Sequence, residues 1–225
     1  MSSVKELVDE ALKPSGTPRV RSGKYSPSSF GKCFRSQYWN RKNEPQTNPP
    51  EERAMRIFKC GKLFHDFIQG VLTEKNPDIK TEVLVETDDI KGFADIVLGD
   101  EVVDLKSVHS SKFHYLIKAK DVRESEKPHF LQVMLYVMLL NKKQGRIVYI
   151  SKDDLSFQEY VYDLEGYWKT EVEKELNTLK SLWEKGELPE AKPRAYFDKD
   201  GKSKECEYCS FKDKCFKLQK ENISG

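Results

Sequence analysis

Residues 92–106 read Gly-Phe-Ala-Asp-Ile-Val-Leu-Gly-Asp-Glu-Val-Val-Asp-Leu-Lys, and this stretch decides the fold. Two runs rich in Val, Ile, Leu and Phe, residues 93–98 and 101–106, flank Gly99-Asp100, a pair typical of a two-residue hairpin turn. Asp95, Asp104 and Lys106 interrupt runs that otherwise have the composition of buried strands. Charged side chains are rarely buried unless they are paired or bind a metal, so we interpret these three as a chemical site.

The register of this hairpin decides whether the two acids can act together. With a two-residue turn, Leu98 lies opposite Glu101 and Asp95 lies opposite Asp104, on one face and with Cβ atoms roughly 5 Å apart. Lys106 shares that face with Asp104. Two carboxylates this close repel each other unless a cation lies between them, and a divalent ion prefers such oxygen ligands. The hairpin therefore predicts a metal site that positions a phosphodiester for cleavage. The alternative, a solvated surface hairpin, fits the apolar flanks poorly.

Composition limits the class of protein. The chain has 225 residues, of which 34% are charged, yet its net charge is only +2, so any nucleic-acid surface must be a local patch. No stretch approaches the apolar length of a membrane span, and the first residues lack the apolar core of a signal peptide. The five cysteines are an odd number, which disfavours a disulfide framework. We expect a soluble, cytoplasmic protein.

The hydrophobic periodicity predicts an α/β protein. Helices are expected over residues 3–12, from Ser26-Pro27 through Tyr38, and over 51–75, 128–140 and 165–185. Strands are expected over residues 79–87, 93–98, 101–106, 146–151 and 156–162. Residues 112–126 are polar and ambiguous. This order of elements predicts a mixed central sheet flanked by helices.

The cysteines give a second signal. Cys206, Cys209 and Cys215 form a C-x2-C-x5-C run in a segment with too few apolar residues for a core of its own, and a thiolate-bound metal would order it. Cys33 and Cys60 are the candidates for a fourth ligand, and Cys33 is favoured because Cys60 resembles an ordinary core residue of its helix. A tight trio with one distant cysteine is typical of an iron–sulfur cluster; a zinc site and free thiols are the alternatives.

Three further side chains are candidates on helices. His65 lies beside the apolar stripe of the helix over residues 51–75, where it is either a metal ligand or an ordinary boundary residue. Gln132 and Tyr136 are four residues apart on the apolar helix over 128–140, so they project from one face. A glutamine among apolar neighbours needs hydrogen-bond partners, which the hairpin site or a bound strand would supply; a solvent-facing helix boundary is the alternative.

Together these residues resemble the PD-(D/E)XK nuclease superfamily over about residues 26–216. Asp95 followed by Asp104-Leu105-Lys106 resembles its signature. Gln132 with Tyr136 resembles the Q-x3-Y motif of the RecB-like branch, and His65 resembles the histidine ligand of that branch. The sequence departs from the pattern at Ala94, where many relatives have proline, and at Asp104, where many have glutamate.

The four cysteines Cys33, Cys206, Cys209 and Cys215 resemble those that hold a four-iron–four-sulfur cluster in CRISPR-adaptation exonucleases and AddB-type nuclease subunits. The resemblance implies a single nuclease domain over residues 1–225. Its restriction-endonuclease-like core would span 51–185. Residues 26–42 and 200–218 would form an iron–sulfur subregion that joins the two ends of the chain.

The resemblance also implies roles for the site residues. Asp95, Asp104 and the carbonyl of Leu105 would bind Mg²⁺ or Mn²⁺, with His65 as a further ligand. Lys106 would orient or activate the attacking water and stabilise charge on the phosphate. Gln132 and Tyr136 would support the site and contact DNA.

The expected function is that of a metal-dependent DNA exonuclease, with endonuclease activity as an addition. Its substrate would be DNA that is single-stranded or has free ends, in CRISPR adaptation, recombination or phage DNA processing. Two alternatives stay open. One is a recombination nuclease that works with a separate helicase chain, because this sequence has no G-x4-G-K-[ST] motif. The other is a non-catalytic nucleic-acid-binding adaptor with a structural metal centre.

Overall fold

The computed structural model describes residues 3–13, 21–191 and 204–224, and the chain divides into two compact units. The sheet unit comprises residues 24–31 and 60–180. The cysteine unit comprises residues 1–23, 32–59 and 181–225. The single nuclease domain expected from the sequence stays a prediction. No helix among the described residues is long and apolar enough to cross a membrane.

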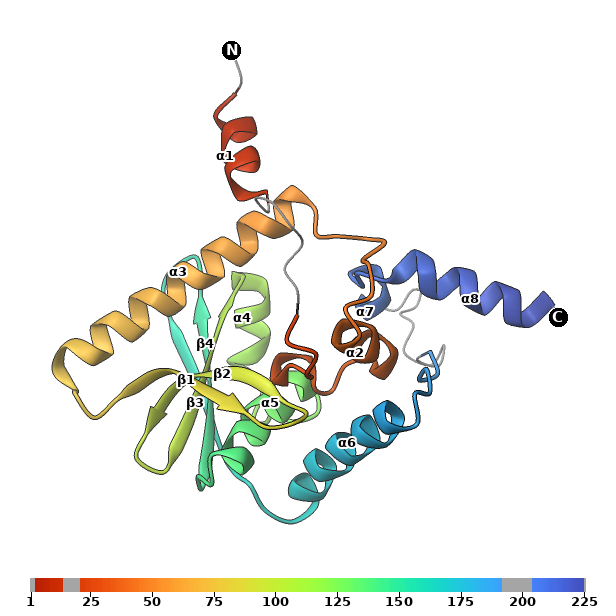
Figure 1. Cartoon of the computed structure of the whole chain (residues 1–225). Helices are drawn as coiled ribbons and strands as arrows, with labels where there is room; N and C mark the ends of the chain where they lie inside the picture. The colour runs from red at the N-terminus through yellow and green to blue at the C-terminus, as the bar shows by residue number, and fades with distance from the viewer. Residues whose placement is uncertain (1–2, 14–20, 192–203, 225) are drawn as a thin grey trace. The chain divides into compact units, whose positions relative to one another are not determined.

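The sheet unit is built on one five-stranded mixed sheet (Figure 1). Neighbouring strands are antiparallel except for β3 and β4, which run parallel. The strands, in spatial as well as chain order, are β1 (Lys80–Glu86), β2 (Lys91–Leu98), β3 (Glu101–Val108), β4 (Gln144–Ser151) and β5 (Phe157–Asp163). This sheet confirms the predicted α/β class and all five expected strands.

Helices cover both faces of this sheet, on opposite sides in Figure 1. The second half of α3 (Glu52–Lys75) packs Phe64, Ile68 and Leu72 against a core that includes Ile96 and Leu105. On the other face lies α5 (Lys127–Leu139), reached from β3 through α4 (Ser110–Leu116), as a parallel pair requires a crossover. The close packing of α5 uses a glycine of β4, since a Cβ on Gly145 would lie only 3.0 Å and 3.1 Å from the Cγ2 atoms of Val133 and Val137. The last helix of this region is α6 (Gly166–Glu184).

The helix predicted to begin at Ser26-Pro27 is interrupted. The structure forms a short 3-10 turn, η1 (Pro27–Ser29), and α2 (Phe34–Arg41) begins only after Cys33, which is its N-cap residue. The cause lies at Gly31, whose φ of +75° belongs to the left-handed region. Its N–H donates a hydrogen bond of 2.7 Å to Glu175 Oε1. Cys33 therefore lies at the start of a helix rather than inside one.

The cysteine unit has a small aromatic core. Tyr38 and Trp39 of α2 are buried with Phe211, and the rings of Trp39 and Phe211 lie 5.3 Å apart. The ring of Trp183 packs 5.5 Å from that of Tyr38. The remaining helices are α1 (Val4–Leu12), α7 (Lys204–Glu207) and α8 (Lys212–Ser224). In the described part of the segment that carries Cys206, Cys209 and Cys215, Phe211 is fully buried, which the composition of the segment did not reveal.

Candidate active site and metal centre

The backbone pairing of β2 with β3 confirms the predicted register of the hairpin. Leu98 pairs with Glu101, and the ladder ends at the pair of Ile96 with Val103. One step further along the two strands come Asp95 and Asp104. Asp95 Oδ2 accepts a hydrogen bond of 2.7 Å from the N–H of Leu105. A side-chain carboxylate thus continues the hydrogen bonding between the two strands beyond the last main-chain pair. The two acids thus lie at neighbouring positions on adjacent strands.

Asp104 is a buried carboxylate that lacks hydrogen-bond donors of good geometry. Only 2% of the residue is exposed, and neither of its side-chain oxygens accepts a well-oriented hydrogen bond within the part of the chain that the structure describes. Oδ2 nevertheless lies 2.6 Å from Lys106 Nζ, which makes an ion pair. Burial raises the pKa of Asp104 to about 6, although the Lys106 charge opposes the rise. Buried oxygens of this kind fit a metal ion as their missing partner.

A group of three possible ligands lies beside Asp95. The ligand atoms of His65, Glu82 and Asp95 all lie within 4.8 Å of one another, the only such group among residues 3–13, 21–191 and 204–224. His65 Nδ1 is 3.6 Å from Asp95 Oδ1. Burial lowers the pKa of His65, but the neighbouring Asp95 carboxylate outweighs it and the pKa is raised overall. The mixture of carboxylate oxygens and an imidazole nitrogen suits Mn²⁺ or Mg²⁺.

Glu82 is the site residue that the sequence analysis missed. It belongs to β1, where the pairs of Thr81 with Ile96 and of Val83 with Ala94 leave it opposite Asp95. Its φ of +49° is unusual for a residue with a side chain and marks a local irregularity in the strand. In the sequence, this acid alternates with apolar neighbours and resembles the solvated face of an ordinary strand. Only the register of β1 against β2 could have singled it out.

One residue of α3 holds this group in place. Gln69 Nε2 donates hydrogen bonds to Glu82 Oε1 at 3.1 Å and to the carbonyl oxygen of Asp95 at 2.9 Å. Gln69 follows His65 by four residues, so both project from one face of the helix toward β1 and β2. The helix thus supplies both a possible ligand and a support for two others.

The predicted lysine and glutamine also meet. Lys106 Nζ donates a hydrogen bond of 3.2 Å to Gln132 Oε1 of α5, in addition to its ion pair with Asp104. Tyr136, one turn further along α5, is buried. Burial raises its pKa, and the charges of Asp104 and Asp95 raise it further, so the phenol stays neutral. The structure therefore brings together the helix and hairpin residues that the sequence singled out. Their roles as ligands and catalytic residues stay predictions, as does coordination by the Leu105 carbonyl.

The four cysteines lie in the cysteine unit, whereas Cys60 belongs to the sheet unit. Cys215 Sγ accepts a hydrogen bond of 3.6 Å from Arg35 Nη1, and Cys209 Sγ accepts one of 3.5 Å from the N–H of Phe211. Among the described residues, no three cysteines have sulfur atoms within 4.8 Å of one another. The structure therefore does not support the predicted four-iron–four-sulfur cluster.

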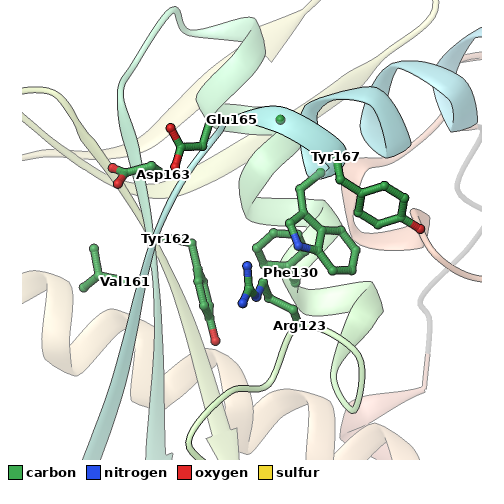
Figure 2. Close-up of a pocket in the computed structure, with 9 residues that line it drawn as sticks. Arg123, Phe130, Val161, Tyr162, Asp163, Glu165 and Tyr167 are labelled. Atoms are coloured by element: carbon green, nitrogen blue, oxygen red, sulfur yellow. The ribbon is translucent and has the colours of Figure 1, made fainter.

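A separate pocket of about 600 Å³ lies on the sheet unit between β5, the start of α6 and Phe130 of α5. Figure 2 shows the Arg123 guanidinium near the ring of Tyr162, with the carboxylates of Asp163 and Glu165 at the other end. The pocket is lined by other residues than those of the hairpin site, and Arg123 is already paired with Asp121 at 2.6 Å. This pocket is distinct from the candidate active site.

Comparisons with known proteins agree with this geometry. The sequence matches the model of the PD-(D/E)XK nuclease superfamily over residues 32–216, and the chain belongs to that superfamily. It matches no curated protein. Membership of the RecB-like branch, which the sequence also resembles, stays a prediction.

Three solved structures share the fold. One is the crystal structure of SSO0001, with a TM-score of 0.55 and 19% identity over 93% of this chain and 95% of that one. Another is LHK-Exo, an alkaline exonuclease from Laribacter hongkongensis, with a TM-score of 0.51 and 14% identity over 80% of this chain and 93% of that one. LHK-Exo in complex with dAMP gives a TM-score of 0.54 and 13% identity, over 73% and 89% of the respective chains.

Proposed function

We propose that this member of the PD-(D/E)XK nuclease superfamily is a metal-dependent deoxyribonuclease that degrades DNA from its ends. The observation that carries the proposal is the buried Asp104 carboxylate, whose oxygens lack donors of good geometry and which adjoins Lys106. A charged group in this position costs stability, so a catalytic role gives a reason for it. The nuclease fold makes phosphodiester hydrolysis the reaction that fits this site best.

The proposed metal ligands are Asp95, Asp104, His65, Glu82 and the Leu105 carbonyl. Asp95 Oδ1 lies 3.6 Å from His65 Nδ1. Glu82 belongs to the same group of possible ligands. A bound Mg²⁺ or Mn²⁺ lowers the pKa of a coordinated water and neutralises charge that builds on the phosphate.

The protein's own residues then orient the reactants. Lys106 Nζ is held between Asp104 Oδ2 and Gln132 Oε1, so its remaining N–H can donate a hydrogen bond to the attacking water or to a phosphate oxygen. The neutral hydroxyl of Tyr136 can donate to the phosphate without adding negative charge. Gln132 fixes the direction of the lysine and supports the site from α5.

We propose DNA that is single-stranded or has free ends as the substrate, because the sequence resembles the RecB-like branch of the superfamily. The process would be CRISPR adaptation, recombination or phage DNA processing, with CRISPR-adaptation proteins or a helicase as partners.

We also retain a metal centre at Cys33, Cys206, Cys209 and Cys215 as a proposal. It is supported by their common location in the cysteine unit and by electrostatics: after burial, the charges of Cys33 and Cys206 contribute to raising the pKa of both Cys209 and Cys215. In a zinc site, tetrahedral bonds of about 2.3 Å would bring the sulfurs to within about 4 Å of one another. In a four-iron cluster each thiolate bonds a different iron, so the sulfurs lie farther apart.

An assay with end-labelled single- and double-stranded DNA, in Mg²⁺, Mn²⁺ or EDTA, tests the proposal. We expect loss of labelled nucleotides from the ends in the presence of metal and none in EDTA. Asp104→Ala and Lys106→Ala should abolish degradation while the circular dichroism spectrum is kept. Asp66→Ala and Lys62→Ala, which remove an exposed ion pair on α3, are matched controls that should cut like the wild type. Cutting by the Asp104 or Lys106 variant at the wild-type rate contradicts the assignment.

A further inference from the structure

Four residues outside the hairpin site form a connected polar cluster on the face of the sheet that α5 covers. Glu126 is buried at the start of α5, where its Oε1 pairs with Lys112 Nζ of α4. Its Oε2 lies 3.4 Å from Nδ1 of His129. The same ring nitrogen lies 3.0 Å from the hydroxyl of Tyr149 on β4, which is hydrogen-bond distance. A buried carboxylate thus holds a lysine and a histidine together.

This cluster adjoins the candidate active site through two connections. Lys106 of β3 pairs with Tyr149 of β4 in the parallel register, so the two residues lie side by side on one face of the sheet. On α5, Gln132 follows His129 by three residues, so both project from one side of the helix. Gln132 Oε1 accepts the hydrogen bond from Lys106. Since all of these residues belong to the sheet unit, the cluster lies next to the lysine that would contact the scissile phosphate.

Lys112 and His129 are accessible, although the carboxylate that holds them is not. Of the Lys112 side chain 42% is exposed, and of the His129 side chain 31%. Lysine and charged histidine are strong hydrogen-bond donors to phosphate. An imidazole between a carboxylate and a phosphate is favoured in its charged form, in which one N–H faces Glu126 and the other can donate to the phosphate. Glu126 therefore orients two donors that suit one phosphate group.

An aromatic ring lies on the same side of α4 as the lysine. Tyr115 follows Lys112 by three residues, is 54% exposed, and has its ring centre 5.8 Å from Lys112 Nζ. Unpaired bases stack on exposed aromatic rings of this kind, whereas the bases of a duplex are already stacked on one another. A phosphate ligand beside such a ring suits one nucleotide of a single strand.

We propose that Lys112, His129 and Tyr115 form a subsite for one nucleotide of single-stranded DNA, beside the scissile phosphate. Lys112 and His129 bind a phosphate of the strand, and Tyr115 stacks on the base. Glu126 is a positioning residue, because it acts on the DNA only through the two donors that it holds. The inference rests on the proposed nuclease function and deepens it, since it assigns a contact that favours a single strand over a duplex.

Binding of the full-length protein to fluorescently labelled oligo(dT) in EDTA, measured by anisotropy, tests the subsite without cleavage. His129→Gln and Lys112→Gln each keep a polar side chain beside Glu126, and each should weaken binding by roughly tenfold or more through loss of a charge-assisted hydrogen bond. Lys112→Arg should bind like the wild type. Lys143→Gln is the matched control, because it removes the same charge from an exposed lysine just before β4, at the end away from Tyr149.

Two further measurements separate direct contact from structural damage. Lys112→Gln should reduce the slope of log affinity against log salt concentration by about 0.7, the value for one phosphate contact to a single strand. Tyr115→Leu should keep this slope but weaken binding to oligo(dT) by roughly fivefold or more, and it should leave binding to a blunt duplex unchanged. Wild-type affinity in the His129, Lys112 or Tyr115 variant, or weaker binding of Lys112→Gln with an unchanged slope, overturns the subsite.

The nuclease assay separates failure of this inference from failure of the proposed function. If the wild type degrades DNA while the three variants bind oligo(dT) like the wild type, only the subsite is overturned. If the wild type neither binds nor degrades DNA, the proposed function fails and the subsite fails with it.

Discussion

Replacing Asp104 by asparagine should stabilise the metal-free protein while it destroys activity. The pKa of this buried carboxyl is about 6 in the folded protein against an ordinary value of 3.8, because burial penalises the charged form. A raised folded-state pKa means that the folded protein binds the proton more tightly than the unfolded chain. The free energy of unfolding therefore falls as the pH rises from about 4 to about 6, and the full penalty is present above that range.

The size of this penalty follows from the same two values. Each pKa unit corresponds to about 1.4 kcal/mol, so the charged Asp104 costs on the order of 2–3 kcal/mol at pH 8. Asparagine has nearly the same shape without the charge, so it should restore much of this free energy of unfolding. The gain is reduced by the loss of the ion pair between Lys106 and Asp104. For a chain of this size the gain corresponds to a rise in Tm of roughly 4–10 °C.

Thermal unfolding in EDTA at pH 8 and at pH 4 checks this expectation. Asp104→Asn should be more stable than the wild type at pH 8 and nearly equal to it at pH 4, whereas Asp66→Asn, at an exposed carboxylate, should change little. Adding Mn²⁺ should reduce the difference in Tm between Asp104→Asn and the wild type at pH 8, since only the wild type is stabilised by the bound ion. The reasoning is refuted if Asp104→Asn is the less stable protein at pH 8, or if the difference does not depend on pH.

Further expectations concern the ligand group, the cysteines and the packing of α5. Glu82→Gln should lower the affinity for Mn²⁺ by roughly 10–100-fold in calorimetric titration with the fold intact, because one charged oxygen of the ligand group is lost; unchanged affinity would remove Glu82 from the site. The proposed metal centre at the cysteines is tested by colour and metal content after purification without oxygen. A four-iron cluster predicts brown protein with about four irons that Cys33→Ala bleaches and Cys60→Ala does not, whereas colourless protein with one zinc identifies a zinc site. Protein that holds neither metal contradicts the proposed centre. Gly145→Ala should destabilise the chain by about 1–3 kcal/mol in urea unfolding, because its methyl group would press on the stiff β-branched side chains of Val133 and Val137. A neutral effect would show that α5 can shift.

The hairpin could be predicted from the sequence because its information is local. Gly99-Asp100 fixes the turn, and the turn alone sets Leu98 against Glu101, from which the positions of Asp95 and Asp104 follow. The α/β class was also accessible, since the strands and long helices have clear periodicities. Local pattern and tertiary structure agree in this part of the chain.

Glu82 and the start of α2 depend on non-local contacts. Glu82 becomes a candidate ligand only through the register of β1 against β2 and the hydrogen bond from Gln69. Neither contact can be predicted from the local sequence pattern. The helix expected to contain Cys33 begins later because Gly31 adopts a positive φ where a side chain would meet Pro128 of α5 at 3.0 Å. Contacts with residues farther along the chain decided both outcomes: strand pairing and a hydrogen bond for Glu82, and packing against α5 for Gly31.

The two carboxylate oxygens of Asp95 have different partners, one in the backbone of β3 and one in the proposed ligand group. Oδ2 holds the N–H of Leu105 at the point where β2 and β3 cease to pair, and Oδ1 faces His65. Asp95→Ala would remove both the hydrogen bond to the N–H of Leu105 and a proposed metal ligand. An inactive Asp95→Ala protein would therefore not tell which of the two losses abolished activity. Asparagine keeps an oxygen acceptor for the strand, and comparing the two substitutions separates a misshapen site from one that has lost only a charge.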